Sequence, residues 1–187
     1  MQAARGASLT EPGTSEHRHD SPPSRRPRRL LTFVSVAVLA YALDVVTKSL
    51  AVAMLSGRPP VHVVGDLLTL QLARNPGAAF STATSYTLAL SCLAIVAALV
   101  VVGVARRVRS TGWAIGLGLL LAGICGNLTD RIFREPGVLR GHVVDFLALP
   151  HWPVFNVADM CIDVAAAFII VQAIRGIRVD GSRHDER

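Results

Sequence analysis

Charged residues are scarce in this chain and are kept away from its longest apolar stretches. Asp, Glu, Lys and Arg make up 17% of the 187 residues, whereas hydrophobic residues make up 51% and the mean hydropathy is +0.46. This composition argues against a soluble domain. The formal net charge of +6 raises the question of a nucleic-acid partner. The basic residues, however, cluster in two tails and one short loop without aromatic residues between them, which is typical of membrane topology and argues against nucleic acid.

Cysteine is also scarce, and no Cys-x-x-Cys motif occurs. Cys92, Cys125 and Cys161 all lie inside apolar segments, where a cysteine behaves as a small apolar side chain. The sequence therefore predicts neither a disulfide framework nor a zinc site. His142 and His151 lie near aspartates, but there is no His-Glu-x-x-His motif. We accordingly expect no metal and no cofactor.

Four apolar runs are each long enough to cross a bilayer, which takes roughly 20 residues. They occupy residues 30–55, 83–105, 111–129 and 154–174. The sequence thus predicts a mainly α, polytopic membrane protein with four transmembrane helices. Arginines followed by an apolar stretch and Ala40-Tyr41-Ala42 also resemble a cleavable signal peptide. The apolar character continues to Leu55, which favours a retained span.

Three segments follow from this pattern. Residues 1–29 are predicted to be a disordered basic tail, because they contain hardly any large apolar residue. Residues 30–175 form the expected four-helix membrane domain, and residues 176–187 a second tail. Of the 19 Lys and Arg residues, 13 lie in the two tails and in the loop between the second and third runs. Because positive residues are enriched in cytoplasmic segments, both termini are predicted to be cytoplasmic.

The loop at 56–82 is predicted to lie on the extracytoplasmic side and to contain a small β-element. Residues 68–72 alternate apolar and polar side chains, which is the period of a half-buried strand. They are followed by Asn75-Pro76-Gly77, a strong turn signal.

Three aspartates stand at the borders of apolar sequence, where a carboxylate is costly and indicates a functional site. They are Asp130, Asp145 and Asp159, and two of them together could activate a water molecule. Which one partners Asp159 is open from the sequence. Arg131 adjoins Asp130 and would hold it in an ion pair. Asp145 is flanked by apolar residues, which would raise its pKa as a shared proton requires, so Asp145 is the better partner and Asp130 a supporting residue.

Other polar residues accompany these aspartates. Asp44 and Lys48 share a helix face at i, i+4. One interpretation is a neutralised pair with Lys48 snorkelling to the interface, the other is that both residues reach the mouth of the site, and the two are compatible. Asn127 precedes Asp130 by three residues, as Asn156 precedes Asp159. Asn156 could simply be a helix N-cap with Asp159 at position N3.

At these residues the chain resembles the lipoprotein signal peptidases, or signal peptidase II. The matching motifs occur in order across the four runs. They are Asp44 with Lys48, Asn75-x-Gly77-x-Ala79-Phe80, Gly126-Asn127-x-x-Asp130-Arg131, Val143-Val144-Asp145-Phe146 and Phe155-Asn156-x-Ala158-Asp159. Two features depart from the family pattern: the stretch 132–140 is longer than usual, and Asp163 is unexpected.

The resemblance implies a membrane-embedded aspartyl endopeptidase of the bacterial cytoplasmic membrane, with its active site near the outer leaflet. It implies removal of signal peptides from prolipoproteins immediately before the diacylglyceryl-modified cysteine, contact with membrane lipid, and inhibition by globomycin-type compounds. We expect a monomer. The resemblance assigns catalysis to Asp145 and Asp159. It places Asn75, Asn127, Arg131 and Asn156 around the substrate and the catalytic pair. With Asp44, Lys48, Gly77 and Asp130, they make up the expected substrate-binding or dyad-supporting residues.

Two rival hypotheses belong to other functional classes. A small transporter would use its carboxylates as a proton relay and would tolerate changes at Asp145. A non-catalytic lipoprotein-binding protein would still bind its ligand after substitution of either Asp145 or Asp159.

Overall fold

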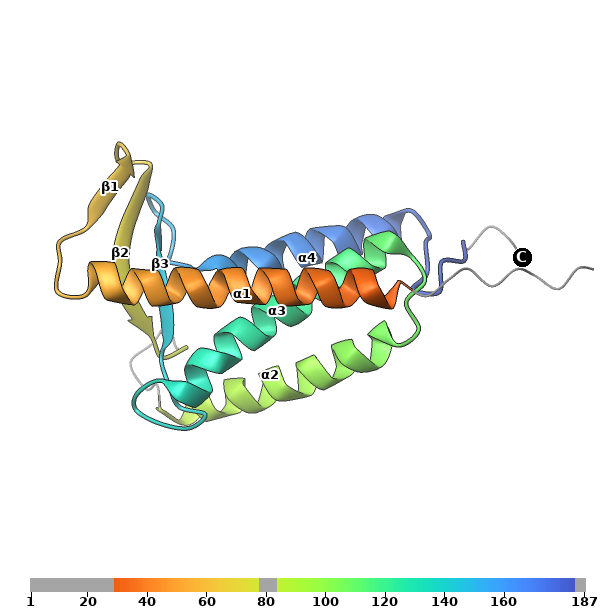
Figure 1. Cartoon of the computed structure of the whole chain (residues 1–187), viewed down its shortest axis with the longest axis horizontal. Helices are drawn as coiled ribbons and strands as arrows, with labels where there is room; N and C mark the ends of the chain where they lie inside the picture. The colour runs from red at the N-terminus through yellow and green to blue at the C-terminus, as the bar shows by residue number, and fades with distance from the viewer. Residues whose placement is uncertain (1–28, 78–83, 184–187) are drawn as a thin grey trace, which may run out of the picture.

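The computed structural model describes residues 29–77 and 84–183 as four helices with a small sheet at one end (Figure 1). The helices are α1 (Leu30–Leu55), α2 (Thr84–Ala105), α3 (Thr111–Phe133) and α4 (Val157–Ile174), and the strands are β1 (Val61–Val64), β2 (Leu68–Asn75) and β3 (Val143–Ala148). All four helices are long and apolar enough to span a membrane. The prediction of a mainly α polytopic membrane protein is therefore confirmed. The tail residues 1–28 and 184–187, and Ala79 and Phe80, lie outside the described residues.

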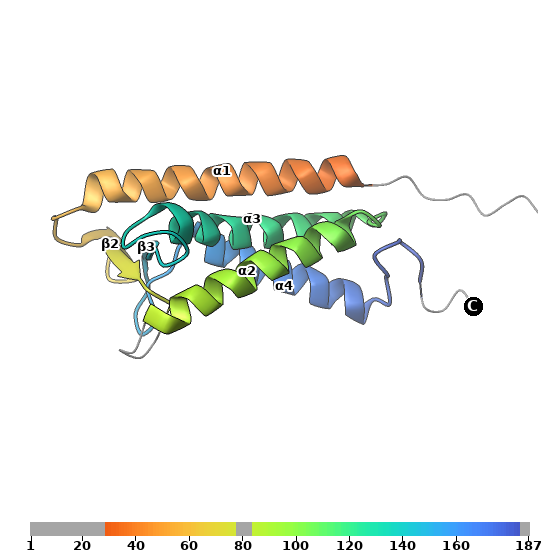
Figure 2. The same cartoon turned by 90° about the horizontal axis from the view of Figure 1, so that it is seen from below.

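The helices run along the long axis of the molecule, and the sheet lies at the end opposite the start of α1 and the end of α4 (Figures 1 and 2). α3 contacts each of the other three helices. Glycines on α3 allow it to pack closely against its neighbours. A Cβ at Gly123, for example, would lie 2.5 Å from the backbone oxygen of Ala158 on α4. The start of α1 and the end of α4 lie at the same end of the bundle, as four spans require.

Two helix boundaries differ from the expected ones. α3 continues about one turn beyond residue 129, to Phe133, although the added turn contains Asp130 and Arg131. Asp130 is buried there in ion pairs with Lys48 and Arg134, so its charge does not end the helix. α4 begins at Val157 rather than at residue 154, because Asn156 caps its first turn.

The three strands form one antiparallel sheet in the order β1-β2-β3. The β-element expected at residues 68–72 is confirmed in β2, but β1 and β3 were not predicted from the sequence. In the register of β2 with β3, Ala73 lies opposite Asp145 and Arg74 lies opposite Val144. The sheet therefore brings Asp145 next to the end of β2.

Apolar cores hold both ends of the bundle. Near the termini, a cluster of α1, α2, α3 and the loop between α2 and α3 contains Phe33, Val101, Ala105, Val108, Ala114 and Leu117. At the other end, Phe146 of β3 packs against Ala51 and Leu55 of α1.

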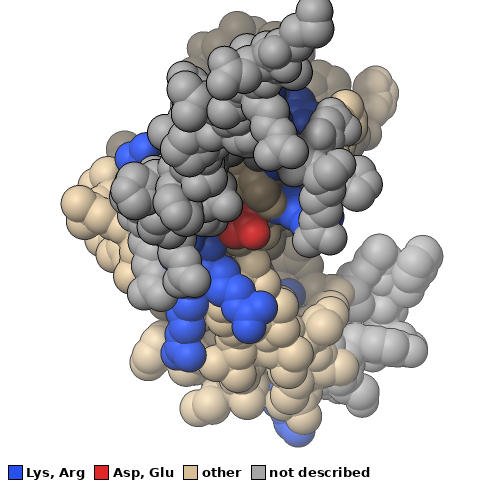
Figure 3. Space-filling view, turned by 90° about the vertical axis from the view of Figure 1, so that its right-hand side faces the viewer, with Lys and Arg blue, Asp and Glu red and all other residues tan. Residues whose placement is uncertain are grey.

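The residues after α4 fold back onto the loop between α2 and α3. The backbone N–H of Arg109 donates to the Val179 carbonyl at 2.9 Å, and the Trp113 indole donates to the Ile177 carbonyl at 2.7 Å. Basic side chains predominate at this end of the molecule (Figure 3). The exposed ones are Arg29, Arg106, Arg107, Arg175, Arg178 and Arg183.

Candidate active site

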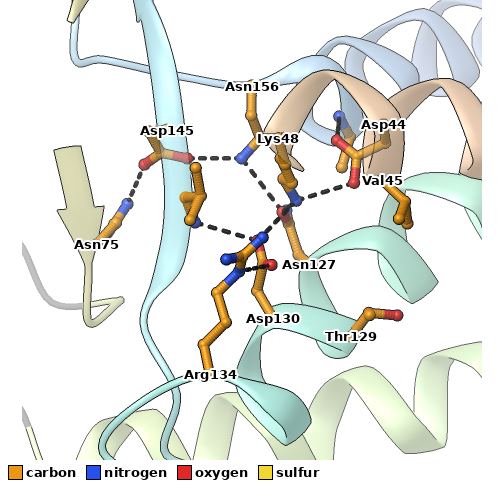
Figure 4. A network of polar contacts seen from close by, with 12 residues as sticks. Asp44, Val45, Lys48, Asn75, Asn127, Thr129, Asp130, Arg134, Asp145 and Asn156 are labelled. Carbon is orange, nitrogen blue, oxygen red and sulfur yellow. Dashed lines mark hydrogen bonds and ion pairs between the residues drawn. The ribbon is translucent and has the colours of Figure 1, made fainter. Parts of the chain in front are cut away.

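Polar side chains from three helices and two strands converge where the sheet meets the bundle (Figure 4). Asp145 lies on β3 and is 2% exposed. Each of its oxygens accepts a hydrogen bond from an amide: Oδ1 from Asn156 Nδ2 at 2.6 Å, and Oδ2 from Asn75 Nδ2 at 2.9 Å. Asn75 belongs to β2, and Asn156 is the N-cap residue of α4. Asp145 is consequently held in one orientation from two sides.

Asp159 lies in the first turn of α4 and takes part in a capping box with Asn156. The Asn156 side chain accepts a hydrogen bond from the Asp159 backbone N–H at 3.1 Å, while Asp159 Oδ2 accepts one from the Asn156 backbone N–H at 3.1 Å. The N-cap interpretation of Asn156 is therefore confirmed. The other Asp159 oxygen, Oδ1, accepts a hydrogen bond from Asn127 Nδ2 at 2.8 Å.

Asn156 connects the two aspartates, because its side-chain amide is hydrogen-bonded to the Asp145 carboxylate and to the Asp159 backbone. Its Oδ1 is bound to the Asp159 backbone, and its Nδ2 donates to Asp145 and, at 3.2 Å, to Asn127 Oδ1. Its side chain is completely buried. The structure thus brings Asp145 and Asp159 to one site through the same asparagine.

A buried ion cluster lies next to this site. Lys48 Nζ is 2.9 Å from Asp44 Oδ2, 3.1 Å from Asp130 Oδ2 and 2.9 Å from Asn127 Oδ1. Its side chain is 1% exposed, so the interpretation that Lys48 snorkels to the interface is wrong. Because Lys48 can only donate, it requires an oxygen of Asn127 and leaves the Asn127 amide N–H groups to face Asp159.

The carboxylate of Asp44 is fixed by backbone as well as by charge. Its Oδ1 accepts a hydrogen bond from the Ala158 backbone N–H at 2.8 Å. A Cβ at Gly126 of α3 would lie 2.4 Å from Asp44 Oδ2, so only glycine leaves room for this carboxylate. Asp44 therefore joins α1 to the N-terminus of α4 across α3.

The expected ion pair between Asp130 and Arg131 is wrong. Asp130 pairs instead with Lys48 and with Arg134, and its Oδ2 also accepts a hydrogen bond from the Val144 backbone N–H at 3.1 Å. The physical reason is that consecutive residues on a helix point in different directions, whereas Asp130 and Arg134, at i and i+4, share a face. Arg134 was missed from the sequence, although its i, i+4 spacing was the signal that could have found it.

Arg131 is directed toward the turn after β2. A Cβ at Gly77, which has φ +88°, would lie 2.8 Å from Arg131 Nη2 and 3.1 Å from Nη1. Nη1 is buried and has no hydrogen-bond partner among the described residues. Gly77 in turn donates its backbone N–H to Asn75 Oδ1 at 2.8 Å, which orients the Asn75 amide toward Asp145.

Burial is the main influence on the Asp145 carboxyl group. It raises the pKa of Asp145 above its ordinary value, and the nearby charge of Asp159 acts in the same direction. The hydrogen bonds from Asn75 and Asn156 oppose this rise, because they stabilise the ionised form. The net direction is upward, as expected from the apolar flanks of Asp145.

Two expected features lie outside this cluster. Asp163 is exposed on α4, although it is one turn from the half-buried Asp159. His151 is exposed and His142 is half-buried. Within residues 29–77 and 84–183, no three His, Cys, Asp or Glu side chains are grouped as metal ligands.

A family model and two curated relatives all point to the same protein family. The family model described as signal peptidase (SPase) II matches residues 36–175. The lipoprotein signal peptidase of Rhodococcus jostii (strain RHA1) is 47% identical over 177 residues, covering 90% of this chain and 89% of that protein. The lipoprotein signal peptidase of Mycobacterium avium (strain 104) is 49% identical over 160 residues, covering 86% of this chain and 88% of that protein.

The fold also matches a solved structure. A bacterial membrane enzyme determined by the in meso method at 1.9 Å resolution superposes with a TM-score of 0.72 at 24% sequence identity. The match covers 81% of this chain and 97% of the other. It supports the arrangement of four helices and a small sheet.

Proposed function

The chain belongs to the signal peptidase II family and is a multi-pass membrane protease that processes prolipoprotein signal peptides; on that premise, we propose that it is an aspartic endopeptidase with Asp145 and Asp159 as its catalytic pair. The observation that carries this proposal is the shared asparagine: Asn156 binds Asp145 at 2.6 Å and caps the helix that carries Asp159. In our proposal the two carboxyl groups, which lie on either side of this asparagine, share one proton.

The two carboxyl groups differ in environment, and this difference suggests their roles. Asp145 is buried on β3 and its pKa is raised, and in our proposal it holds the proton of the resting pair. Asp159 lies in the first turn of α4, where the helix dipole stabilises negative charge. In our proposal Asp159 takes a proton from water as the water attacks the scissile carbonyl, and Asp145 polarises that carbonyl. The tetrahedral intermediate then collapses, and the leaving amine receives its proton from the pair.

The supporting residues orient this pair or receive substrate. Lys48 fixes the orientation of the Asn127 side-chain amide, which donates a hydrogen bond to Asp159. Asn75 holds Asp145, and Gly77 leaves room for the guanidinium of Arg131. In our proposal Arg131, whose Nη1 is buried and has no hydrogen-bond partner among the described residues, donates to a substrate carbonyl. Asp44 and Asp130 neutralise Lys48 and tie α1, α3, α4 and β3 together.

The finer assignments complete the proposal. Cleavage falls immediately before the diacylglyceryl-modified cysteine, whose lipid anchors the substrate at the depth of the aspartates. Both termini lie in the cytoplasm, in accordance with the basic end of the bundle, and the site lies near the outer leaflet. The protein acts as a monomer and is inhibited by globomycin-type compounds. The domain of residues 30–175 carries the activity, and the tails at 1–29 and 176–187 do not.

The decisive test is cleavage of a diacylated prolipoprotein by purified protein, followed by gel shift. Asp145→Asn and Asp159→Asn are each expected to lower kcat by about 10³-fold or more, because each removes a proton-transfer group. Asp163→Asn, which changes an exposed carboxylate on the same helix, serves as the matched control and should retain wild-type activity. Thermal unfolding verifies that all three variants are folded.

Other results would redirect the proposal. If Asp145→Asn still cleaved, Asp130 would be the next partner to test. If both catalytic-pair variants were fully active, the aspartic mechanism would be wrong. Substrate binding without cleavage by folded wild-type protein would favour a binding protein.

A further inference from the structure

An apolar groove lies beside the candidate active site, on the other face of β3. It has a volume of about 300 Å³ and is formed between the last turns of α1 and the sheet. Leu50 and Met54 of α1 form one side, and Val61, Leu70 and Phe146 from the three strands form the other. Phe146 follows Asp145 directly, and successive side chains of a strand point to opposite faces. The groove is therefore separate from the catalytic pair.

One end of the groove carries a positive charge. Arg58 lines it, is exposed, and forms no ion pair with any acidic residue of the described chain. α1 ends at Leu55, and Gly57 takes φ +68° so that the Arg58 backbone N–H can bond back to the Leu55 carbonyl at 3.2 Å. This turn places Arg58 just beyond the end of a membrane-spanning helix, at the depth of lipid headgroups.

The opposite end of the groove is apolar and lies toward the middle of the apolar helix α1. It reaches Thr47, whose hydroxyl is already bonded to the carbonyls of Leu43 at 2.8 Å and Asp44 at 3.0 Å. From Thr47 to Leu55, α1 rises about 12 Å, which suits an extended acyl chain. Leu50 and Met54 are 53% and 59% exposed, so nothing in the described chain covers this side.

We propose that this groove binds one anionic phospholipid molecule, with an acyl chain along α1 and its phosphate at Arg58. An apolar cleft with a basic residue at the headgroup level is the arrangement that recognises anionic lipid. The charge favours a phospholipid over a neutral diacylglyceryl group, which has no phosphate for Arg58. A second apolar groove of about 370 Å³, between α1 and α3, has no charged residue in its lining and lacks this feature.

The test is lipid binding by the full-length protein in detergent, measured by native mass spectrometry. Phosphatidylglycerol, phosphatidylcholine and diacylglycerol with the same acyl chains are compared. Wild type should retain one phosphatidylglycerol and bind it more tightly than either other lipid. Arg58→Gln should weaken phosphatidylglycerol binding about five-fold and leave diacylglycerol binding unchanged, the effect of one arginine near an anionic headgroup.

Two matched controls make the result specific. Arg140→Gln removes another exposed arginine, in the loop between α3 and β3, and should leave binding unchanged. Thr47→Phe, which fills the apolar end, should weaken binding of all three lipids. Val46→Phe, at a 54% exposed position outside the groove, should not.

Three results would overturn the proposal. Diacylglycerol could bind as tightly as phosphatidylglycerol, which would assign the groove to a neutral diacylglyceryl group. Arg58→Gln could be indistinguishable from Arg140→Gln. Thr47→Phe could leave binding unaffected. None of these results depends on proteolytic activity, so this test and that of the catalytic pair fail independently.

Discussion

Each end of the bundle has a buried apolar cluster, but among the described residues the buried charged side chains all lie at the sheet end. Near the start of α1, apolar side chains such as Phe33 and Leu117 pack in a cluster of hydrophobic residues. At the sheet end, Lys48 and Asp145 are just as buried, and each is fixed by directional contacts. Apolar packing depends on area and volume, whereas a buried charge depends on each of its partners. We therefore expect catalytic activity to tolerate changes of side-chain shape at the apolar end and not at the polar end.

The largest effect is expected when the central cation of the polar end is removed. Lys48→Met keeps most of the side-chain volume but leaves Asp44 and Asp130 facing each other without a cation between them. Breaking a buried ion pair from one side typically costs about 3–5 kcal/mol of unfolding free energy. Denaturation in detergent measures the loss. The double variant Asp44→Asn/Lys48→Met should recover part of it, and equal stability of Lys48→Met and wild type would contradict the comparison.

A pair of glycines on α3 tests both ends with the same substitution. A Cβ at Gly126 would lie 2.4 Å from Asp44 Oδ2, and one at Gly118 would lie 2.9 Å from the Phe33 carbonyl. Each alanine variant should lose about 1–3 kcal/mol of unfolding free energy through overpacking. Only Gly126→Ala should also lower kcat, because it displaces the carboxylate that joins α1 to α4.

Gly103→Ala on α2, where a Cβ would meet nothing within 4 Å, is the control for the effect of replacing a helical glycine by alanine without overpacking. Equal loss of specific activity in Gly118→Ala and Gly126→Ala would show that the two ends are not functionally distinct.

A volume-conserving change sharpens the contrast at the apolar end. Leu117→Met should cost less than about 1.5 kcal/mol of unfolding free energy and leave kcat/KM unchanged, because unbranched and branched apolar side chains substitute well in a core. Leu117 is 4% exposed and belongs to the cluster near the termini. The matched Asn127→Leu at the polar end should abolish cleavage, since it removes the amide between Lys48 and Asp159. Gel shift and thermal unfolding read out the two effects.

The smallest expected effect is a shift in pH dependence. The Asn75 amide stabilises the ionised form of Asp145, which lowers the pKa of that carboxyl group. Asn75→Ala removes this contribution, so the pKa of Asp145 should rise further. The basic limb of the kcat/KM profile, on which Asp145 loses its proton, should therefore move to higher pH. A move to lower pH would contradict the role of Asp145, and Thr69→Ala on the same strand should leave the profile unchanged.

Much of the fold could be predicted because the spans are local features. The run 30–55 coincides with α1, and the end of the run 154–174 coincides with that of α4. The last turn of α3 could not be predicted, because its charges are neutralised by Lys48 on another helix. β3 was missed because a short apolar run does not reveal its partner strand, and β2 lies about 70 residues away.

The sequence by itself determined the number of spans, the basic character of the end that carries the termini, and which polar residues had to be accommodated at the edges of apolar segments. Only the tertiary structure decided which of these residues meet. It separated Arg131 from Asp130, directed Arg134 to Asp130 instead, and joined Asp145 to Asn75, 70 positions away, and to Asn156. The physical reason is that hydropathy accumulates along the chain, whereas a hydrogen bond or ion pair depends on the distance and direction between segments that only folding brings together.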